Sequence, residues 1–218
     1  MLSLNIKFNF EVPEQSPAKR DEAKGSYNIF MVVEISKIPG GKELIDVPNL
    51  LGKIGVTERM TIADLGCGRR GYFSLQVAKL VGPRGLVYAV DILQPSLKSL
   101  ESMAHLFGIN NIKTVWGDLE IEGAIKIPNE SVDFVFLNNI LFQTKNHEII
   151  FKEVIRILKK NSRLLVTEWE KTSAPFGPDP SVRVDREYVK KQAGHIGLIL
   201  EKDLKAGPYH YSLVFKKA

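Results

Sequence analysis

Cysteine and long apolar runs are almost absent from this sequence, and each absence excludes a class of protein. The 218 residues include one cysteine, Cys67, which excludes an intrachain disulfide and a cysteine-rich metal cluster. The longest apolar stretches, such as residues 29–33, are too short to cross a bilayer. The N-terminus lacks a basic flank followed by an apolar core, so we expect no signal peptide and a cytoplasmic protein.

A strong charge of either sign is also missing. The 30 basic and 25 acidic residues leave a formal net charge of +5, scattered along the chain. Such a balance permits contact with nucleic acid or a membrane surface but does not argue for either. The hydrophobic content of 44% suits one domain with a full core and a small appendage. Function must therefore be inferred from local motifs.

The most informative motif is a glycine-rich turn between a short apolar run and a helical pattern. Residues 61–65 have the composition of a buried strand, and Gly66, Gly68 and Gly71 follow them. Glycines allow a sharp turn and let a ligand approach bare backbone N–H groups. The next helix directs its free N–H groups and positive dipole end to the same place. A turn of this kind binds a nucleotide-like or carboxylate-bearing ligand.

Two ligands fit this turn. The three glycines match the dinucleotide pattern G-x-G-x-x-G, and Asp91 follows at the spacing of the ribose-binding acid. Asp64 distinguishes them, because a carboxylate two residues before Gly66 would repel a pyrophosphate. It would instead attract a cationic ligand such as S-adenosylmethionine, which carries an ammonium and a sulfonium. The alternative is a structural Asp64 that caps the turn.

The string Asp64-Leu65-Gly66-Cys67-Gly68 resembles the first motif of the class I S-adenosylmethionine-dependent methyltransferases. The resemblance covers roughly residues 42–218. It implies an α/β fold with a doubly wound, Rossmann-like sheet of seven strands, mostly parallel with an antiparallel last strand. It also implies an enzyme that methylates a small molecule, of the type found in quinone biosynthesis.

The order of predicted elements agrees with that fold. Apolar runs predict strands at residues 61–65, 86–90, 112–116, 132–137 and 163–167. Helical patterns lie between them, the last at 147–160, which favours a parallel sheet with ligands at the carboxyl ends of its strands. Two further β-like runs, at 196–204 and 209–215, have only a hairpin-sized gap between them. No crossover helix fits that gap, so we expect the last strand to be antiparallel.

Residues 1–41 form a separate N-terminal extension before the 42–218 domain. Alternating residues at 5–12 predict a half-buried strand, and the β-rich run at 27–35 predicts a second one. One interpretation is a loosely attached tail. The other is a β-hairpin that acts as a lid or as the contact of a homodimer.

The resemblance assigns five residues to the amino-acid end of the cofactor. Gly66, Cys67 and Gly68 would form the loop around its amino-acid part, with Cys67 as a small filler. Asp64 would lie near the ammonium, directly or through water. Asn138, at the end of the fourth strand, would line the cofactor near its sulfonium.

Four more residues would hold the nucleoside end. Asp91 would accept both ribose hydroxyls, because two adjacent donors need an acceptor with two oxygens. The alternative interpretation of Asp91 is a helix N-cap, and the two roles are compatible. Ile92 would pack on the adenine, whose amino group would donate to Asp118, with the Leu119 backbone nearby.

The acceptor is harder to infer, because the methyl group is already activated and the protein chiefly aligns the reactants. Phe142, Glu168 and Trp169 follow the fourth and fifth strands, and we predict that they face a small-molecule methyl acceptor. No catalytic residue and no metal site is evident. Tyr209-His210-Tyr211 fits either a pocket lining or the alternation of an edge strand.

Other acceptors and functions are less consistent with the motifs. The sequence from Asn138 to Phe142 lacks the Asn/Asp-Pro-Pro-aromatic motif of many amine methyltransferases, which disfavours a nucleic-acid acceptor. A nicotinamide-dependent reductase would use the same glycines but conflicts with Asp64. A non-catalytic S-adenosylmethionine-binding protein fits every motif and stays open.

Overall fold

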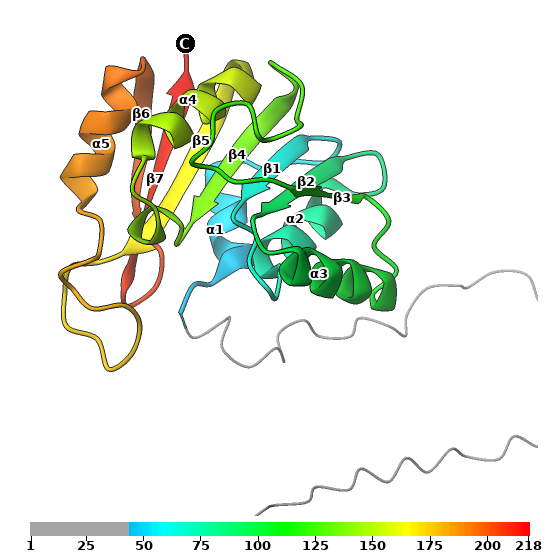
Figure 1. Ribbon diagram of the computed structural model, residues 1–218, viewed down its shortest axis with the longest axis horizontal. Helices are drawn as coiled ribbons and strands as arrows, with labels where there is room; N and C mark the ends of the chain where they lie inside the picture. Colours follow the sequence, from blue (N-terminus) through cyan, green and yellow to red (C-terminus); the bar gives the residue numbers. More distant parts are fainter. Residues whose placement is uncertain (1–43) are drawn as a thin grey trace, which may run out of the picture. The chain divides into compact units, whose positions relative to one another are not determined.

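A computed structural model describes residues 44–218, whose core is a seven-stranded sheet (Figure 1). The strand order is β3-β2-β1-β4-β5-β7-β6. The strands are β1 (Thr61–Leu65), β2 (Leu86–Asp91), β3 (Ile112–Trp116), β4 (Val132–Asn138), β5 (Leu158–Trp169), β6 (Leu198–Lys205) and β7 (His210–Lys217). The predictions for residues 1–41, including the β-hairpin and the dimer contact, lie outside the described residues.

Helices cover both faces of the sheet (Figure 1). They are α1 (Val47–Ile54), α2 (Tyr72–Val81), α3 (Gln94–Leu106), α4 (His147–Ile157) and α5 (Arg186–His195), with a short 3-10 helix η2 (Leu141–Gln143). The apolar faces of α1, α2 and α3 share one buried cluster with the sheet, and those of α4 and α5 share the other. The chain is therefore a three-layered α/β domain, as predicted.

The direction of the last strand confirms the hairpin argument. β7 lies between β5 and β6 and is antiparallel to both, whereas β1 to β5 pair in parallel. The connection between β6 and β7 has no helix. The carboxyl ends of β1, β2, β3, β4 and β5 consequently meet at one edge of the sheet.

Local signals in the sequence set several helix boundaries. Asp46 caps α1 by accepting a hydrogen bond from the Asn49 N–H at 3.2 Å. Asp185 caps α5 through the N–H of Glu187 at 2.9 Å. The boundary between α4 and β5 differs from the prediction, because the helix ends at Ile157 rather than residue 160. Leu158 pairs with Val132 instead and lengthens β5, a contact that no local pattern reveals.

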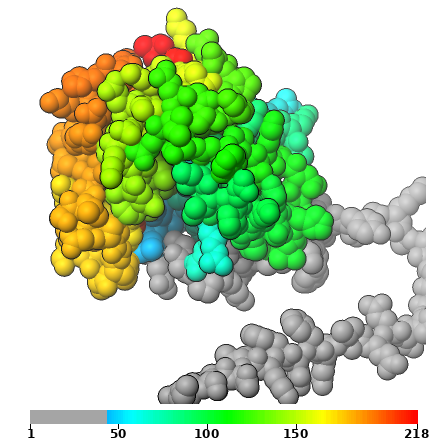
Figure 2. All heavy atoms as spheres, viewed as in Figure 1, coloured from blue at the N-terminus to red at the C-terminus, as the bar shows by residue number. Residues whose placement is uncertain are grey.

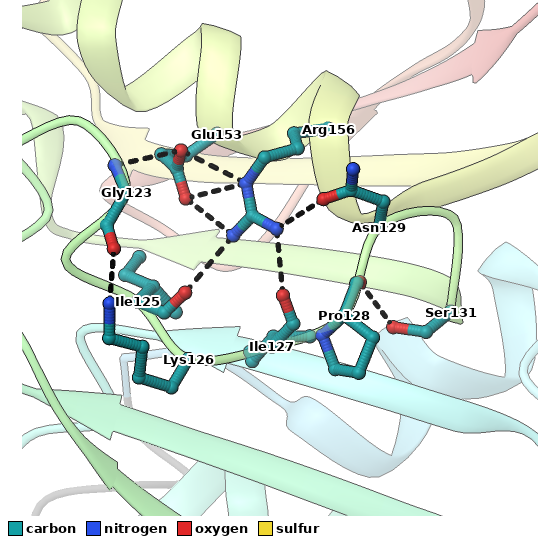
Figure 3. A network of polar contacts seen from close by, with 9 residues as sticks. All are labelled: Gly123, Ile125, Lys126, Ile127, Pro128, Asn129, Ser131, Glu153 and Arg156. Carbon is teal, nitrogen blue, oxygen red and sulfur yellow. Dashed lines mark hydrogen bonds and ion pairs between the residues drawn. The ribbon is translucent and has the colours of Figure 1, made fainter.

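A buried ion pair anchors the long connection between β3 and β4 (Figure 3). Arg156 on α4 bonds to Glu153 at 2.7 Å and also donates to the carbonyls of Ile125 and Ile127, at 3.1 and 2.7 Å. Glu153 is 2% exposed and accepts the Gly123 N–H at 3.3 Å. Residues 123–129 are thereby tied to α4 by hydrogen bonds.

Replacing Arg156 with methionine is expected to destabilise the protein by about 3 kcal/mol, because it leaves a buried carboxylate and two carbonyls without their donor. Urea unfolding measures the loss. Lys152→Met is the matched control, since Lys152 pairs with Glu148 on the exposed side of the same helix and should change stability very little. Equal midpoints for the two variants would contradict a structural role for the Arg156 network.

Candidate functional site

The carboxyl ends of β1, β2 and β3 surround a pocket of about 380 Å³. Figure 2 shows the described residues in space-filling form, with the orange surface of α5 beside the green surface of the middle of the chain. The lining consists of Gly66, Gly68, Arg69, Asp91, Ile92, Leu93, Ser96, Gly117, Asp118, Leu119, Glu120, Ile140, Gln143 and Thr144.

The glycine turn forms one wall of the pocket. Gly66 and Gly68 have φ angles of +82° and +67°, which side-chain-bearing residues rarely adopt. The N–H groups of Gly66 and Cys67 both donate to the Val90 carbonyl at 2.9 Å, so the turn is tied to the end of β2. A Cβ added to Gly68 would meet nothing within 4 Å. A ligand can therefore approach the backbone at Gly68.

Asp91 organises the turn as well as the start of the next helix. One carboxylate oxygen accepts the Gly68 N–H at 2.9 Å and the other accepts the Leu93 N–H at 2.8 Å. Asp91 is not the N-cap of α3, which is Leu93. A carboxylate has about four acceptor positions. Asp91 thus retains capacity for further donors from a ligand in the pocket.

Asp64 lies buried behind the turn, beside Asn138. The Ser74 hydroxyl donates to Asp64 Oδ2 at 2.6 Å. Burial raises the pKa of Asp64 to about 6, and the Ser74 bond and the nearby Asn138 amide partly oppose that rise. Within residues 44–218, neither Oδ1 nor Nδ2 of Asn138 reaches hydrogen-bonding geometry with any group, although both are buried. An unsatisfied buried amide next to a carboxylate calls for a polar ligand group.

The opposite wall of the pocket is formed by residues predicted to bind the nucleoside part of the cofactor. Asp118 and Leu119 follow β3, and Asp118 Oδ1 accepts the Glu120 N–H at 2.8 Å. Ile92 is 54% exposed at the rim. Sequence reasoning missed Trp116, whose indole N–H donates to the Ile92 carbonyl at 2.9 Å and fixes that rim. An aromatic residue directly before the Gly-Asp turn was the available signal.

Six of the nine predicted cofactor residues line the pocket, namely Gly66, Gly68, Asp91, Ile92, Asp118 and Leu119. Asp64, Cys67 and Asn138 lie close to it in the chain or the sheet but are not in its lining. Burial, followed by the charges of Asp64 and Asp91, raises the pKa of the Cys67 thiol far above its usual range. A thiol kept in its neutral form is a poor nucleophile, which supports the prediction that Cys67 is a small filler. The cofactor roles stay predictions.

The predicted acceptor residues do not converge on this pocket. Glu168 is fully buried, and its Oε1 accepts the Leu141 N–H at 2.7 Å, so it supports η2 from below. Burial raises the pKa of Glu168 to about 8, against the opposing effect of the backbone N–H groups of residues 140–142. Phe142 is partly buried against the core, and Trp169 is 6% exposed. Glu168 thus positions part of the pocket wall without lining it.

A second acidic residue holds the same segment from the pocket side. Glu120 Oε1 accepts the N–H groups of Lys145 and Asn146, both at 2.7 Å. The Asn146 side chain does not cap α4 itself. Glu120 therefore links the segment after β3 to the segment between β4 and α4.

A smaller pocket of about 280 Å³ lies at the other end of the strands, between the end of α2 and the segment after α3. The Asn111 amide in its wall already donates to the carbonyls of Ala78 and Gly82, at 2.8 and 2.9 Å. This smaller pocket offers no comparable unsatisfied group and lies far from the glycine turn.

Within the described part of the chain, no group of three His, Cys, Asp or Glu side chains is arranged to hold a metal ion. None of the helices seen between residues 44 and 218 has the length and apolarity needed to traverse a bilayer.

Comparison with known sequences places this geometry in a family. A model of the methyltransferase domain matches residues 57–210. The ubiquinone/menaquinone biosynthesis C-methyltransferase UbiE of Pasteurella multocida is 27% identical over 156 residues, covering 71% of this chain and 55% of that protein. The chain spans about half the length of the curated relatives that it matches.

Solved structures agree on the fold. A SAM-dependent methyltransferase from Aquifex aeolicus superimposes with a TM-score of 0.77 at 23% identity, covering 83% of this chain and 94% of that one. The [4+2]-cyclase SpnF gives a TM-score of 0.65 at 15% identity, covering 78% of this chain and 79% of that one. The domain model covers most of the chain and the sheet has the expected order, so this chain belongs to the class I S-adenosylmethionine-dependent methyltransferases.

Proposed function

We propose that this chain transfers the methyl group of S-adenosylmethionine to a small-molecule acceptor by in-line displacement. The observation that carries the proposal is the buried Asp64 carboxylate beside the unsatisfied Asn138 amide, directly behind the glycine turn. A cationic ligand end would donate to the Asp64 carboxylate and to the Asn138 Oδ1. A pyrophosphate at the same turn would meet a repulsive carboxylate.

The residues present fit the whole cofactor. Asp91 would accept the ribose hydroxyls with its remaining lone pairs, and Gly68 leaves its backbone open to the amino-acid part. Ile92 and Asp118 would contact the adenine. When bound, the cofactor supplies an electrophilic methyl group. The chain's own contribution is to hold both reactants in line and to exclude water.

The names of the relatives support one class of acceptor. UbiE is named as a C-methyltransferase of ubiquinone and menaquinone biosynthesis, which supports a quinone-like small molecule as the acceptor here. Because SpnF is named as a cyclase and shares the fold, the fold alone does not determine the reaction. Transfer of a labelled methyl group to a panel of phenols, quinols, amines and thiols tests it directly. Cofactor binding with no labelled product would favour a non-catalytic binding protein.

Substituting Asp64 with asparagine is expected to weaken S-adenosylhomocysteine binding about tenfold or more near neutral pH. The change keeps the shape but removes a charge-assisted hydrogen bond worth about 1.5–3 kcal/mol. The pKa of Asp64 is about 6, so the wild-type affinity should fall as pH drops through that value and the carboxylate becomes protonated. The variant should lack this step. Isothermal titration calorimetry between about pH 5 and 8 measures both effects.

Asp133→Asn is the matched control, because Asp133 accepts the Thr61 N–H at 2.8 Å at the other end of the sheet and should not affect the cofactor. NAD is titrated into the same proteins. If Asp64→Asn binds NAD more tightly than the wild type, and neither protein binds S-adenosylhomocysteine, the methyltransferase proposal is wrong and a nicotinamide-dependent reductase is favoured.

A further inference from the structure

The segments that follow β3 and β4 line the same pocket, although those two strands are not neighbours. β2 and β1 lie between them in the sheet, so β3 and β4 are three strand spacings apart, or about 14 Å. Residues 117–120 follow β3 and line the pocket. Residues 143–146, which we name the outer wall, follow β4 and contribute Gln143 and Thr144 to the lining. A contact between the two segments must therefore span the carboxyl ends of β1 and β2.

One side chain makes that contact. Glu120 Oε1 accepts the N–H groups of Lys145 and Asn146, both at 2.7 Å. Among residues 44–218, these are the only hydrogen bonds between the segment after β3 and the outer wall. The glycine turn follows β1 and the predicted ribose-binding acid ends β2, so the bridge from Glu120 spans the strands that carry the predicted cofactor residues.

The other hydrogen bonds of the outer wall lead back to its own side of the pocket. The N–H groups of Gln143 and Thr144 donate to the carbonyls of Ile140 and Leu141, at 3.0 and 3.2 Å. His147 Nε2, at the start of α4, lies 2.8 Å from the Leu141 carbonyl oxygen and 3.2 Å from that of Thr144. These partners all lie between β4 and the first residue of α4. They shape the outer wall but do not hold it toward the nucleoside side.

Glu120 is itself placed by the residue that is predicted to bind the adenine. Asp118 Oδ1 accepts the Glu120 N–H at 2.8 Å, which is the turn that an aspartate side chain makes with the backbone two residues on. Within the described residues, Oδ2 of Asp118 has no hydrogen-bond partner, so it stays available to an amino group of a ligand. The base-binding residue and the bridge therefore belong to one turn.

The bridge is made by a charged acceptor. The N–H groups of Lys145 and Asn146 lower the pKa of Glu120, and the charges of Lys145 and His147 act in the same direction. Glu120 is thus ionised at neutral pH. A hydrogen bond to an ionised acceptor is about twice as strong as one between neutral groups. Two such bonds on one oxygen can hold a segment that has no other tie to that side.

We propose that Glu120 is a positioning residue, which holds the outer wall across the ends of β1 and β2 and against the adenine of the bound cofactor. The proposal rests on the methyltransferase function proposed above, because it takes the ligand to be S-adenosylmethionine. Asp118 and Leu119 then contact the base from one segment, and Gln143 and Thr144 contact it from the other. Without the bridge, the outer wall keeps its own internal bonds but loses its place against the base.

The test compares a ligand that contains the base with one that lacks it. S-adenosylhomocysteine contains adenine, and S-ribosylhomocysteine has a hydroxyl group in its place. Glu120→Ala should weaken binding of the first ligand about tenfold and of the second by less than about twofold. Damage to the pocket as a whole would weaken both. Calorimetric titration of the full chain measures the first affinity, and ligand-detected NMR measures the second.

Two further variants separate the bridge from a general effect of substitution. Glu120→Gln keeps a side-chain oxygen with two lone pairs, which can accept both N–H groups without the charge. It should recover part of the lost S-adenosylhomocysteine affinity. Glu122→Ala removes an exposed acid two residues further along the same segment. This matched control should bind both ligands like the wild type.

A second measurement needs no variant. In the proton–nitrogen spectrum of the wild type, the backbone amide signals of Gln143 and Thr144 should shift when adenosine is added, because the outer wall contacts the base. The same signals should shift less in Glu120→Ala.

Three results would overturn the proposal: unchanged S-adenosylhomocysteine affinity in Glu120→Ala, an equal loss for both ligands in that variant, or Gln143 and Thr144 signals that adenosine does not move. Failure of the methyltransferase function has a different signature, because the wild type itself would then not bind S-adenosylhomocysteine.

Discussion

Replacing Asp91 with alanine is expected to reduce S-adenosylhomocysteine affinity by about a hundredfold or more. Two ribose hydroxyls lose a charged acceptor, at about 1.5–3 kcal/mol for each hydrogen bond. The substitution also removes the acceptor of the Gly68 and Leu93 N–H groups, at 2.9 and 2.8 Å. The glycine turn therefore loses its support at the same time as the ligand loses its anchor. Calorimetric titration measures the affinity.

Two variants separate these effects. Asp91→Asn keeps one oxygen acceptor and is expected to have an intermediate affinity. Asp46→Ala removes the cap of α1, so it should lower stability by about 1 kcal/mol without weakening the ligand. A loss below tenfold for Asp91→Ala would mean that the ribose lies elsewhere and that the position of Asp91 in the pocket is coincidental.

The second large effect concerns stability and pH through Glu168. Its pKa is raised to about 8 in the folded protein by burial, whereas an unfolded glutamate has a pKa of about 4.3. Between these values the folded state holds a proton that the unfolded state has lost. Stability should therefore fall as pH rises from about 4.5 to 8, by at most about 1.4 kcal/mol for each pH unit. Below that window the stabilisation by the neutral form is fully present.

Glu168→Gln should remove this dependence. Glutamine is neutral at every pH and its carbonyl can still accept the Leu141 N–H, so η2 keeps its support. Urea unfolding of both proteins at pH 5, 6, 7 and 8 gives two curves that diverge as pH increases, with the variant more stable at pH 8. The raised pKa of Asp64, about 6, also lowers stability as pH rises. Asp64 is present in both proteins, so its effect cancels when the two stability curves are subtracted. Parallel curves would show that Glu168 ionises freely in the fold.

Much of the fold follows from local patterns because the strands are buried on both faces. β2 is an unbroken apolar run before Asp91, and such a run has few alternatives in an α/β chain. Asn161 has a φ angle of +63°, which asparagine tolerates better than most residues and which allows the turn in β5. The antiparallel β7 follows from loop length alone. The start of β5 does not, because the pairing of Leu158 with Val132 depends on distant residues.

Local sequence patterns likewise predict one part of the candidate site and miss another. The glycine turn and Asp91 are consecutive features with a fixed spacing, and the structure brings them into one pocket. Glu168 follows the predicted strand 163–167 as an exposed site residue would, but in the structure it lies within β5 and bonds to the backbone of η2. His210 alternates correctly for an edge strand, yet β7 is an inner strand between β5 and β6. Which side chains are covered is decided by packing between elements, and local patterns carry no information on that.

The placement of the two tryptophans has a practical consequence. The chain has only Trp116 and Trp169, and they lie in different surroundings. Trp116 is 61% exposed beside the rim of the pocket, whereas Trp169 is 6% exposed against His210. The Trp116 indole therefore fluoresces from a solvent-exposed environment and the Trp169 indole from a buried one. A chain that retains only Trp116 would report on the rim of the pocket, and one that retains only Trp169 would report on the buried contact with His210, so events at the two places can be followed separately by stopped-flow emission without attaching a dye.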